Sequence, residues 1–176
     1  DNSISAAKIS SMENNTVTDA VVYYVIQKHD AESRLLYFKD KNEKDFRITP
    51  ETTPYRGHYE TTSGYTANNG QAKTYYVFRS YMEQLEYTGG GTITVAAGTY
   101  TLSHSVCIPS NVTVNFEDGV KIQKVKAVNT NLATNKTMFE LVPPSKEGVK
   151  NSVGGYNGSQ NVTLQGNGST IFDCAY

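Results

Sequence analysis

The sequence predicts an all-β fold in which short parallel strands stack as successive coils, a parallel β-helix, with one amphipathic helix over the first coil. Short apolar runs follow one another closely from residue 92 onward, and a similar four-residue pattern returns along them. A helical pattern directly precedes these runs. The chain has 13 tyrosines, no tryptophan and many small polar residues, a composition that favours strands and turns over long helices.

The helix is predicted at residues 75–87, with Thr74 as its N-cap. Three consecutive glycines at 89–91 are expected to end it, because glycine readily adopts the left-handed conformation found at helix C-termini. Stacked coils leave the apolar end of the first coil open, so we expect this helix to seal it. Its apolar face consists of Val77, Tyr81, Met82 and Leu85.

Strands are predicted in close succession after the helix. The pattern Thr-Ile-Thr-Val at 92–95 returns as Asn-Val-Thr-Val at 111–114, 19 positions later, and as Asn-Val-Thr-Leu after a further 50 positions. We interpret these intervals as one coil and then about two, with loops inserted around an apolar strand at 137–142. An antiparallel sandwich is the alternative for strands so closely spaced. The first five predicted strands lie at 92–95, 99–102, 106–108, 112–116 and 120–123.

Residues 1–70 are predicted to be a small N-terminal β segment and linker, followed by the helix and coils at 71–176. Strand-like runs at 17–27 and 34–39 indicate a hairpin, and 46–49 is predicted as a third strand. Proline, glycine and asparagine punctuate the residues after it, which is typical of a linker.

Charge and hydropathy argue against several partners. The formal net charge is −1 and neither sign forms a long run, so we expect no nucleic-acid or anionic-lipid binding. The longest apolar run is far shorter than the ~20 residues that a membrane span needs. The chain begins at Asp1 without a signal sequence, and we interpret it as a processed or trimmed piece. Cys107 and Cys174 either form a disulfide in an oxidising compartment or remain buried thiols, which is the more common outcome.

Two segments carry a family resemblance. Residues 89–124 read GGGTITVAAGTYTLSHSVCIPSNVTVNFEDGVKIQK, and residues 161–173 read NVTLQGNGSTIFD. A helix followed by Gly-Gly-Gly-Thr, a strand, Ala-Gly-Thr-Tyr and Pro-Ser-Asn-Val-Thr resembles the opening coils of the pectate-lyase-like superfamily, the pectin lyase fold, and of polygalacturonases in particular. The resemblance covers the chain from about residue 75 onward. It implies the N-terminal coils of a right-handed, single-stranded parallel β-helix.

The resemblance also implies a function. The chain would be the N-terminal part of a secreted bacterial polysaccharide hydrolase or lyase. Such a protein would be extracellular or at the cell surface, with a polysaccharide or cell-surface glycan as its partner. Two alternatives use the same coils: a cell-surface adhesin or glycan-binding structural solenoid, and a phage-tailspike-like protein that would trimerise. In each case the uncapped C-terminal end is expected to favour self-association.

We expect no catalytic residues in this chain, and no cofactor or metal. Polygalacturonases share Asn-Thr-Asp, Asp-Asp, Gly-His-Gly and Arg-Ile-Lys motifs, none of which occurs at 71–176. Hydrolysis of a glycosidic bond needs two positioned acids, which those motifs supply. A pectate lyase needs calcium-binding carboxylates and an arginine, whereas all four arginines of this chain precede residue 92.

Other chemically capable residues are predicted to be structural. Glu117 and Asp118 read as an acidic turn, and Asp173 as the end of another turn. His58 stands in a Gly-His-Tyr sequence that matches Gly-His-Gly only superficially, and His104 is predicted to be a solvated turn residue.

Tyrosines remain as candidate ligand contacts, because sugars stack their apolar ring faces on aromatic side chains. Tyr156, in the sequence Gly-Gly-Tyr-Asn-Gly, is the predicted ligand-binding residue. Tyr55, Tyr59 and Tyr65 are expected to be exposed in the linker, whereas the aromatic residues of the helix are expected to pack.

Overall fold

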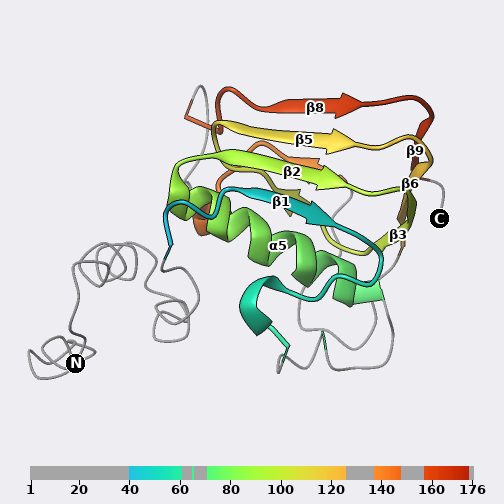
Figure 1. The fold of residues 1–176 in the computed structure, drawn as a ribbon, viewed down its shortest axis with the longest axis horizontal. Coiled ribbons are helices and arrows are strands. Elements are labelled where there is room, and N and C mark those ends of the chain that lie inside the picture. Colours follow the sequence, from blue (N-terminus) through green and yellow to red (C-terminus); the bar gives the residue numbers. More distant parts are fainter. Residues whose placement is uncertain (1–39, 61–64, 66–70, 126–136, 148–156, 175–176) are drawn as a thin grey trace, which may run out of the picture. The chain divides into compact units, whose positions relative to one another are not determined.

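The computed structural model describes residues 40–60, 65, 71–125, 137–147 and 157–174 (Figure 1). Contacts divide the chain into two compact units, Asp1–Lys41 and Asn42–Tyr176, and the second contains every strand and helix described below. The expected hairpin at 17–27 and 34–39 and the predicted ligand contact Tyr156 lie outside the described residues.

Nine described strands form three parallel sheets. The first contains β1 (Asp45–Ile48), β2 (Gly91–Val95), β5 (Val112–Phe116) and β8 (Thr163–Gly166), in that order. The second contains β3 (Gly98–Leu102), β6 (Val120–Lys124) and β9 (Thr170–Asp173). The third contains β4 (Val106–Cys107) and β7 (Phe139–Glu140). The chain runs from β2 to β9 through the first, second and third sheets in turn, then repeats that order, and each return adds a parallel strand.

The strand expected at 46–49 is β1, which pairs in parallel with β2. Phe46 stands opposite Ile93, and Ile48 opposite Val95. This pairing joins residues on both sides of the expected boundary near residue 70, because β1 is the first strand of the sheet that contains β2, β5 and β8. Antiparallel pairing, the alternative for such short strands, does not occur among the described strand pairs.

The strand register confirms one predicted interval and corrects the other. Thr113 pairs with Thr163, which is the expected shift of 50 positions. The expectation that these 50 positions make about two coils is wrong, because β8 is the direct neighbour of β5 and the chain therefore returns to the first sheet only once. Gly91 pairs with Val112, so the first shift is 21 positions and not 19. The sequence match failed here because Asn111 is not in a strand: it has a φ of 61°, and its carbonyl accepts a hydrogen bond from the Gly91 N–H at 3.1 Å. A slip of two residues preserves the alternation of faces, so the apolar pattern alone could not reveal it.

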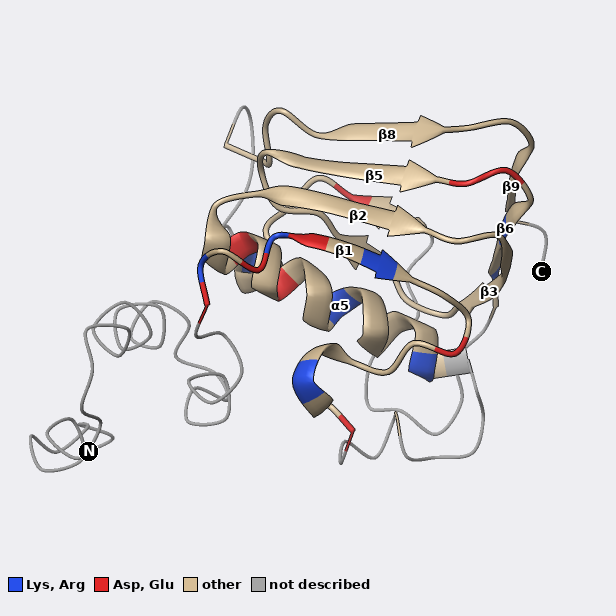
Figure 2. Cartoon of the chain, viewed as in Figure 1, with Lys and Arg blue, Asp and Glu red and all other residues tan. Residues whose placement is uncertain are grey.

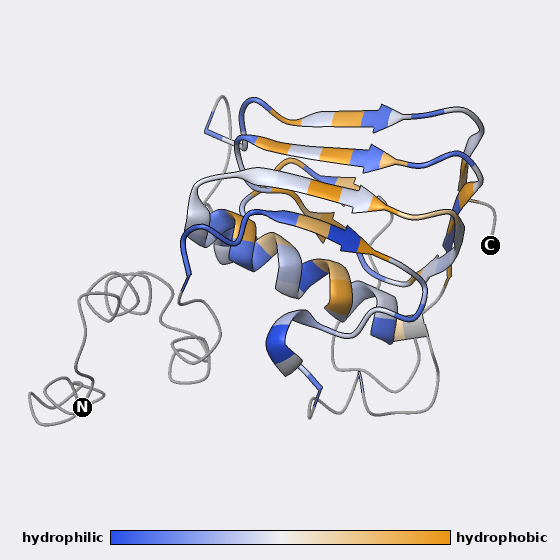
Figure 3. Cartoon of the chain, in the orientation of Figure 1, coloured by the Kyte–Doolittle hydropathy of each residue, from blue (hydrophilic) through white to orange (hydrophobic). Residues whose placement is uncertain are grey.

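The core consists of the inward residues of these strands. Ile93 and Val114 face one another across β2 and β5 and are fully buried, while Leu164 continues the row on β8 and is 46% exposed. Hydrophobic and hydrophilic residues alternate along β2, β5 and β8 in Figure 3. The apolar interior is therefore covered at the β1 and β2 end and partly open at the β8 and β9 end, where Ile171 and Phe172 are also exposed.

Helix α5 (Gln71–Thr88) lies against one strand of each sheet, β2, β3 and β4 (Figure 1). It begins before the expected start, so Thr74 lies within the helix and is not its N-cap. The helix ends at the glycine run, as predicted. Gly89 has a φ of 82°, and the Gly90 N–H donates a hydrogen bond to the Leu85 carbonyl at 2.8 Å. Met82 and Leu85 are fully buried, which confirms that the predicted apolar face packs inward.

Candidate ligand pocket and the ion pairs beside the helix

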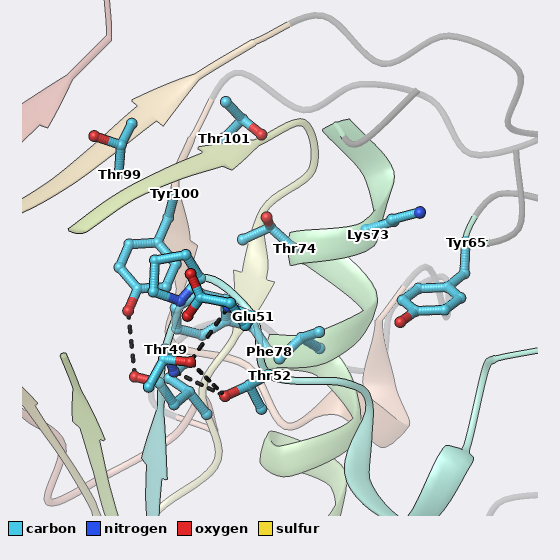
Figure 4. A pocket seen from close by; sticks show the side chains of 13 residues that line it. Thr49, Glu51, Thr52, Tyr65, Lys73, Thr74, Phe78, Thr99, Tyr100 and Thr101 are labelled. Carbon is cyan, nitrogen blue, oxygen red and sulfur yellow. Dashed lines mark hydrogen bonds between the residues drawn. The ribbon is translucent and has the colours of Figure 1, made fainter. Parts of the chain in front are cut away.

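A cavity of about 370 Å³ lies between the first turns of α5, the turn after β1 and strand β3 (Figure 4). Its volume is at the lower end of the range for small-molecule sites. Apolar side chains, including Val77 and Phe78 of α5, form part of its wall. Its lining also includes five threonines, Thr49, Thr52, Thr74, Thr99 and Thr101.

The turn after β1 is held by its own threonines. The Thr49 N–H donates to the Thr52 hydroxyl at 2.8 Å, and the Glu51 N–H donates to the Thr49 hydroxyl at 3.3 Å. On the opposite side of the cavity, Thr99 and Thr101 alternate along β3 and share one face of that strand. Within the described residues neither of these two hydroxyls makes a hydrogen bond, so both can serve a ligand.

The pocket carries one charge of each sign. Lys73, from the first turns of α5, has its ammonium 5.7 Å from the ring centre of Tyr65, and Glu51 lines the pocket from the turn after β1 (Figure 4). Burial, and then the nearby Glu60 carboxylate, raise the pKa of Tyr65. Figure 2 shows charged residues on α5 and β1, while β2, β5 and β8 have none.

A second polar cluster beside α5 is internal. Glu83 is fully buried, and its carboxylate lies 3.2 Å from the Arg79 Nε and 3.3 Å from the His58 Nε2. The Tyr59 hydroxyl donates to the same carboxylate at 2.8 Å. Because α5 and η1 (Tyr55–Gly57) pack together, this cluster attaches the segment after β1 to the helix.

The cluster continues to the segment after β7. The Tyr75 hydroxyl donates to Glu147 at 3.0 Å and accepts a hydrogen bond from Arg79 at 2.8 Å. Burial raises the pKa of Tyr75 and of Glu147. Burial opposes the charge of Arg79, but Glu83 and its other partners outweigh that effect and raise its pKa. These groups form a closed set of internal contacts, and we assign them a structural role.

The short helix η2 (Pro144–Lys146) lies against α5 and is attached at two points. The Ser145 N–H donates to the Glu86 carboxylate of α5 at 3.0 Å, and the Ser145 hydroxyl contacts the same carboxylate. One residue beyond η2, Glu147 reaches Arg79 of α5. A carboxylate of α5, Glu86, thus binds the segment, and a carboxylate of the segment, Glu147, binds α5.

All three linker tyrosines are at least partly buried and pack in the core or against it, in contrast to the expected exposure. Tyr55 is only 4% exposed, and its ring meets those of Phe46 and Tyr81 edge-on at 5.6 Å. Tyr59 is partly buried and packs against the core through Tyr76. The prolines and glycines of this segment predicted a linker. Its tyrosines instead pack on α5, Tyr55 against Tyr81 and Tyr59 against Tyr76. Tyr65 is partly buried and reaches the pocket.

The prediction for His104 is wrong. This residue is 2% exposed, its Nδ1 lies 2.7 Å from the Ser103 hydroxyl, and its ring centre is 4.8 Å from that of Tyr75. The turn is buried because α5 packs on β3 and β4, the strands that flank it. His58, treated as part of a superficial motif match, lies in the internal cluster and not at the pocket.

Three acidic residues in and between the later strands make structural contacts. Glu117 accepts two hydrogen bonds from the Arg47 guanidinium, at 2.8 and 3.2 Å, which link β1 to the turn between β5 and β6. Asp118 accepts the Ser169 N–H at 2.7 Å, and Asp173 lies 3.1 Å from the Lys121 ammonium. Glu117 and Asp118 lie in the turn between β5 and β6, as predicted, whereas Asp173 is the last residue of strand β9 and not a turn residue. Each of the three contacts joins one strand or turn to another.

The two cysteines are free thiols, Cys107 buried and Cys174 exposed. Among the described residues, no three His, Cys, Asp or Glu side chains group in a way that could hold a metal ion. In the same part of the chain, no helix has the length and apolar character to cross a membrane.

Sequence reasoning missed both the pocket and the internal cluster. The spacing of Arg79 and Glu83 is a detectable i, i+4 pair, but their partners Tyr59 and Glu147 come from distant segments whose positions only the fold determines. Comparisons with known proteins found no matching family model, no matching curated protein and no matching solved structure.

Proposed function

We propose that this chain forms the helix-closed first coils of a right-handed parallel β-helix in a secreted bacterial carbohydrate-active protein. The observation that carries the proposal is the shared register shift of neighbouring sheets. From β5 to β8 and from β6 to β9 the pairing advances by 50 positions in both cases. From β2 to β5 it advances by 21, and from β3 to β6 by 22.

Equal or nearly equal shifts in two sheets support a coil. When the chain leaves one sheet, passes through the others and returns to the first, sheets whose circuits contain the same loops advance by about the same number of positions. From β4 to β7 the advance is 33 positions, because that interval contains only the residues inserted before β7. The longer second circuit accommodates additional residues before and after β7, without disturbing the register of the other two sheets. Stacked circuits of this kind bury a shared apolar column and need a cap at the end, a role that suits α5.

Within such a protein we assign this part a closing and supporting role, with hydrolase or lyase chemistry supplied by other coils. Glycoside hydrolysis needs two acids facing a bound sugar. The acids of the coils are instead held in contacts that join strands, as with Glu117 on Arg47 and Asp173 on Lys121. Glu140 accepts the Thr137 hydroxyl at 2.9 Å, and Glu147 is held by Arg79 and Tyr75.

A second candidate is a glycan-binding solenoid without catalysis, such as a cell-surface adhesin. The pocket between α5 and β3 favours it, because that pocket combines hydroxyl groups with an apolar wall on the described chain itself. The two candidates share a carbohydrate ligand and differ in whether other parts of the protein perform chemistry.

The proposal is tested by electrophoresis of the full chain through native gels that contain soluble polysaccharides, both neutral and acidic. At least one polysaccharide should retard the chain relative to a gel without polymer. Assays for new reducing ends and for unsaturated lyase products should remain at the level of the blank. If no polysaccharide retards the chain, the proposed carbohydrate ligand is wrong. If the chain releases reducing ends or unsaturated products, the proposed non-catalytic role is wrong.

A further inference from the structure

We propose that the threonine-lined pocket between α5 and β3 binds one neutral sugar ring. This inference rests on the proposed carbohydrate function and deepens it by naming a site and a ligand class. The site lies beside the helix and not among the acidic turns. Its lining comes from four parts of the chain: the end of β1 with the turn after it, Tyr65, the first turns of α5, and β3.

The shape and lining of the pocket fit a sugar ring. A pyranose has apolar C–H faces and a rim of hydroxyl groups that donate and accept hydrogen bonds. The pocket offers Val77 and Phe78 as apolar wall and Thr99 and Thr101 as hydroxyl rim. Hydroxyl side chains can act as both donor and acceptor, so they match a ligand that does the same. The volume of about 370 Å³ leaves room for a single ring with ordered water.

The charges favour a neutral ligand over a uronic acid. Lys73 would attract a ligand carboxylate, but Glu51 lines the same pocket and would repel it. The hydroxyl groups of a neutral sugar suit both side chains, because a hydroxyl can accept a hydrogen bond from the Lys73 ammonium and donate one to the Glu51 carboxylate. Tyr65 also lines the pocket, and the Lys73 ammonium lies 5.7 Å from its ring centre.

The test is a titration of the isotope-labelled full chain, followed by amide resonances, with methyl glycosides of glucose, galactose, mannose and xylose. At least one of them should shift the resonances of Lys73, Thr99 and Thr101 in a saturable way, with a dissociation constant on the order of 1 mM. Galacturonic acid should bind at least about 10-fold more weakly than the best neutral glycoside.

Matched double variants locate the site. Thr99→Val with Thr101→Val removes the two hydroxyls of β3 without changing side-chain shape, and should weaken binding about 10-fold or more. The control is Thr92→Val with Thr94→Val, the same change at the same spacing on β2, which should leave the dissociation constant unchanged. Lys73→Ala is a second site variant if the β3 pair fails to fold, and should also weaken binding.

The outcomes separate the two proposals. Equal binding by the site and control variants, or tighter binding of galacturonic acid, overturns the neutral-sugar pocket. If no glycoside shifts these resonances while a polysaccharide gel still retards the chain, the pocket is wrong and the proposed function stands. If both signals are absent, both proposals fail.

Discussion

Glu147 and Arg79 lie 3.2 Å apart, although 68 positions separate them in the sequence, and their contact attaches the segment after β7 to α5. The same carboxylate accepts the Tyr75 hydroxyl. Both ionic side chains are only 20% exposed. Because water screens this ion pair so little, replacing either partner should change the free energy of unfolding and its dependence on pH.

The pH dependence of stability should change when Glu147 is replaced. Burial raises its pKa, with Arg79 acting in the opposite direction. A raised folded-state pKa stabilises the fold below the unfolded-state value of about 4.3, and this contribution is lost as pH rises through the folded-state value. Glu147→Gln removes the titration, so its melting temperature minus that of wild type should increase from about pH 4 to pH 7. A difference that stays constant, or matches that of Glu140→Gln, would contradict this.

Arg79→Met should destabilise the fold far more than Arg47→Met. Arg79 neutralises the fully buried Glu83, and removal of one partner of a buried ion pair costs about 3–5 kcal/mol. The Arg47 side chain is 56% exposed, and its pair with Glu117 should contribute under about 1 kcal/mol. Chemical denaturation of both variants measures the free energies of unfolding. Equal losses would show that the internal cluster contributes no more than a surface pair.

Gly91→Ala should be more destabilising than Gly89→Ala. Both glycines have positive φ angles, 152° and 82°, so both alanines are strained, by roughly 1–2 kcal/mol at Gly89. A Cβ on Gly91 would also lie 2.0 Å from the Lys44 carbonyl oxygen, whereas no atom lies within 4 Å of that position at Gly89. The expected total at Gly91 is roughly 3 kcal/mol or more. Equal melting temperatures would mean that the segment before β1 does not approach β2 so closely.

The two cysteines should differ in reactivity with a thiol reagent. Cys174 is exposed, whereas Cys107 is buried and burial raises its pKa, which disfavours the reactive thiolate. The native chain should therefore react rapidly at one thiol, and at both only after unfolding in denaturant. Cys174→Ser should abolish the rapid phase. Absence of any reactive thiol in the unreduced chain would instead indicate a disulfide.

Local patterns predicted most of the elements and few of the distant contacts. Alternating apolar residues located β5 at its observed bounds, and the glycine run located the end of α5, because both signals depend on neighbouring residues alone. The shift from Thr113 to Thr163 was visible because the same turn-and-strand sequence occurs twice.

The errors have physical reasons. The start of α5 was placed too late because Thr74 is a good N-cap residue, and propensity is overridden by packing. The sequence predicts that His104 and Tyr55 are exposed, because turn-rich segments usually lie at the surface. Both are buried, because α5 packs against the segments that contain them. The candidate pocket was not predictable, since Glu51, Lys73 and Thr99 become neighbours only through the fold.

Thermal unfolding of Leu85→Asp tests whether α5 closes the apolar end of the stacked strands. Leu85 is fully buried, so the aspartate should destabilise the fold by roughly 4 kcal/mol and lower the melting temperature by about 10 °C or more. The matched control is Leu164→Asp at the other end, where the side chain is 46% exposed and the loss should stay under about 1 kcal/mol. Similar melting temperatures for Leu85→Asp and wild type, or an equal loss in the control, would contradict the closing role of α5.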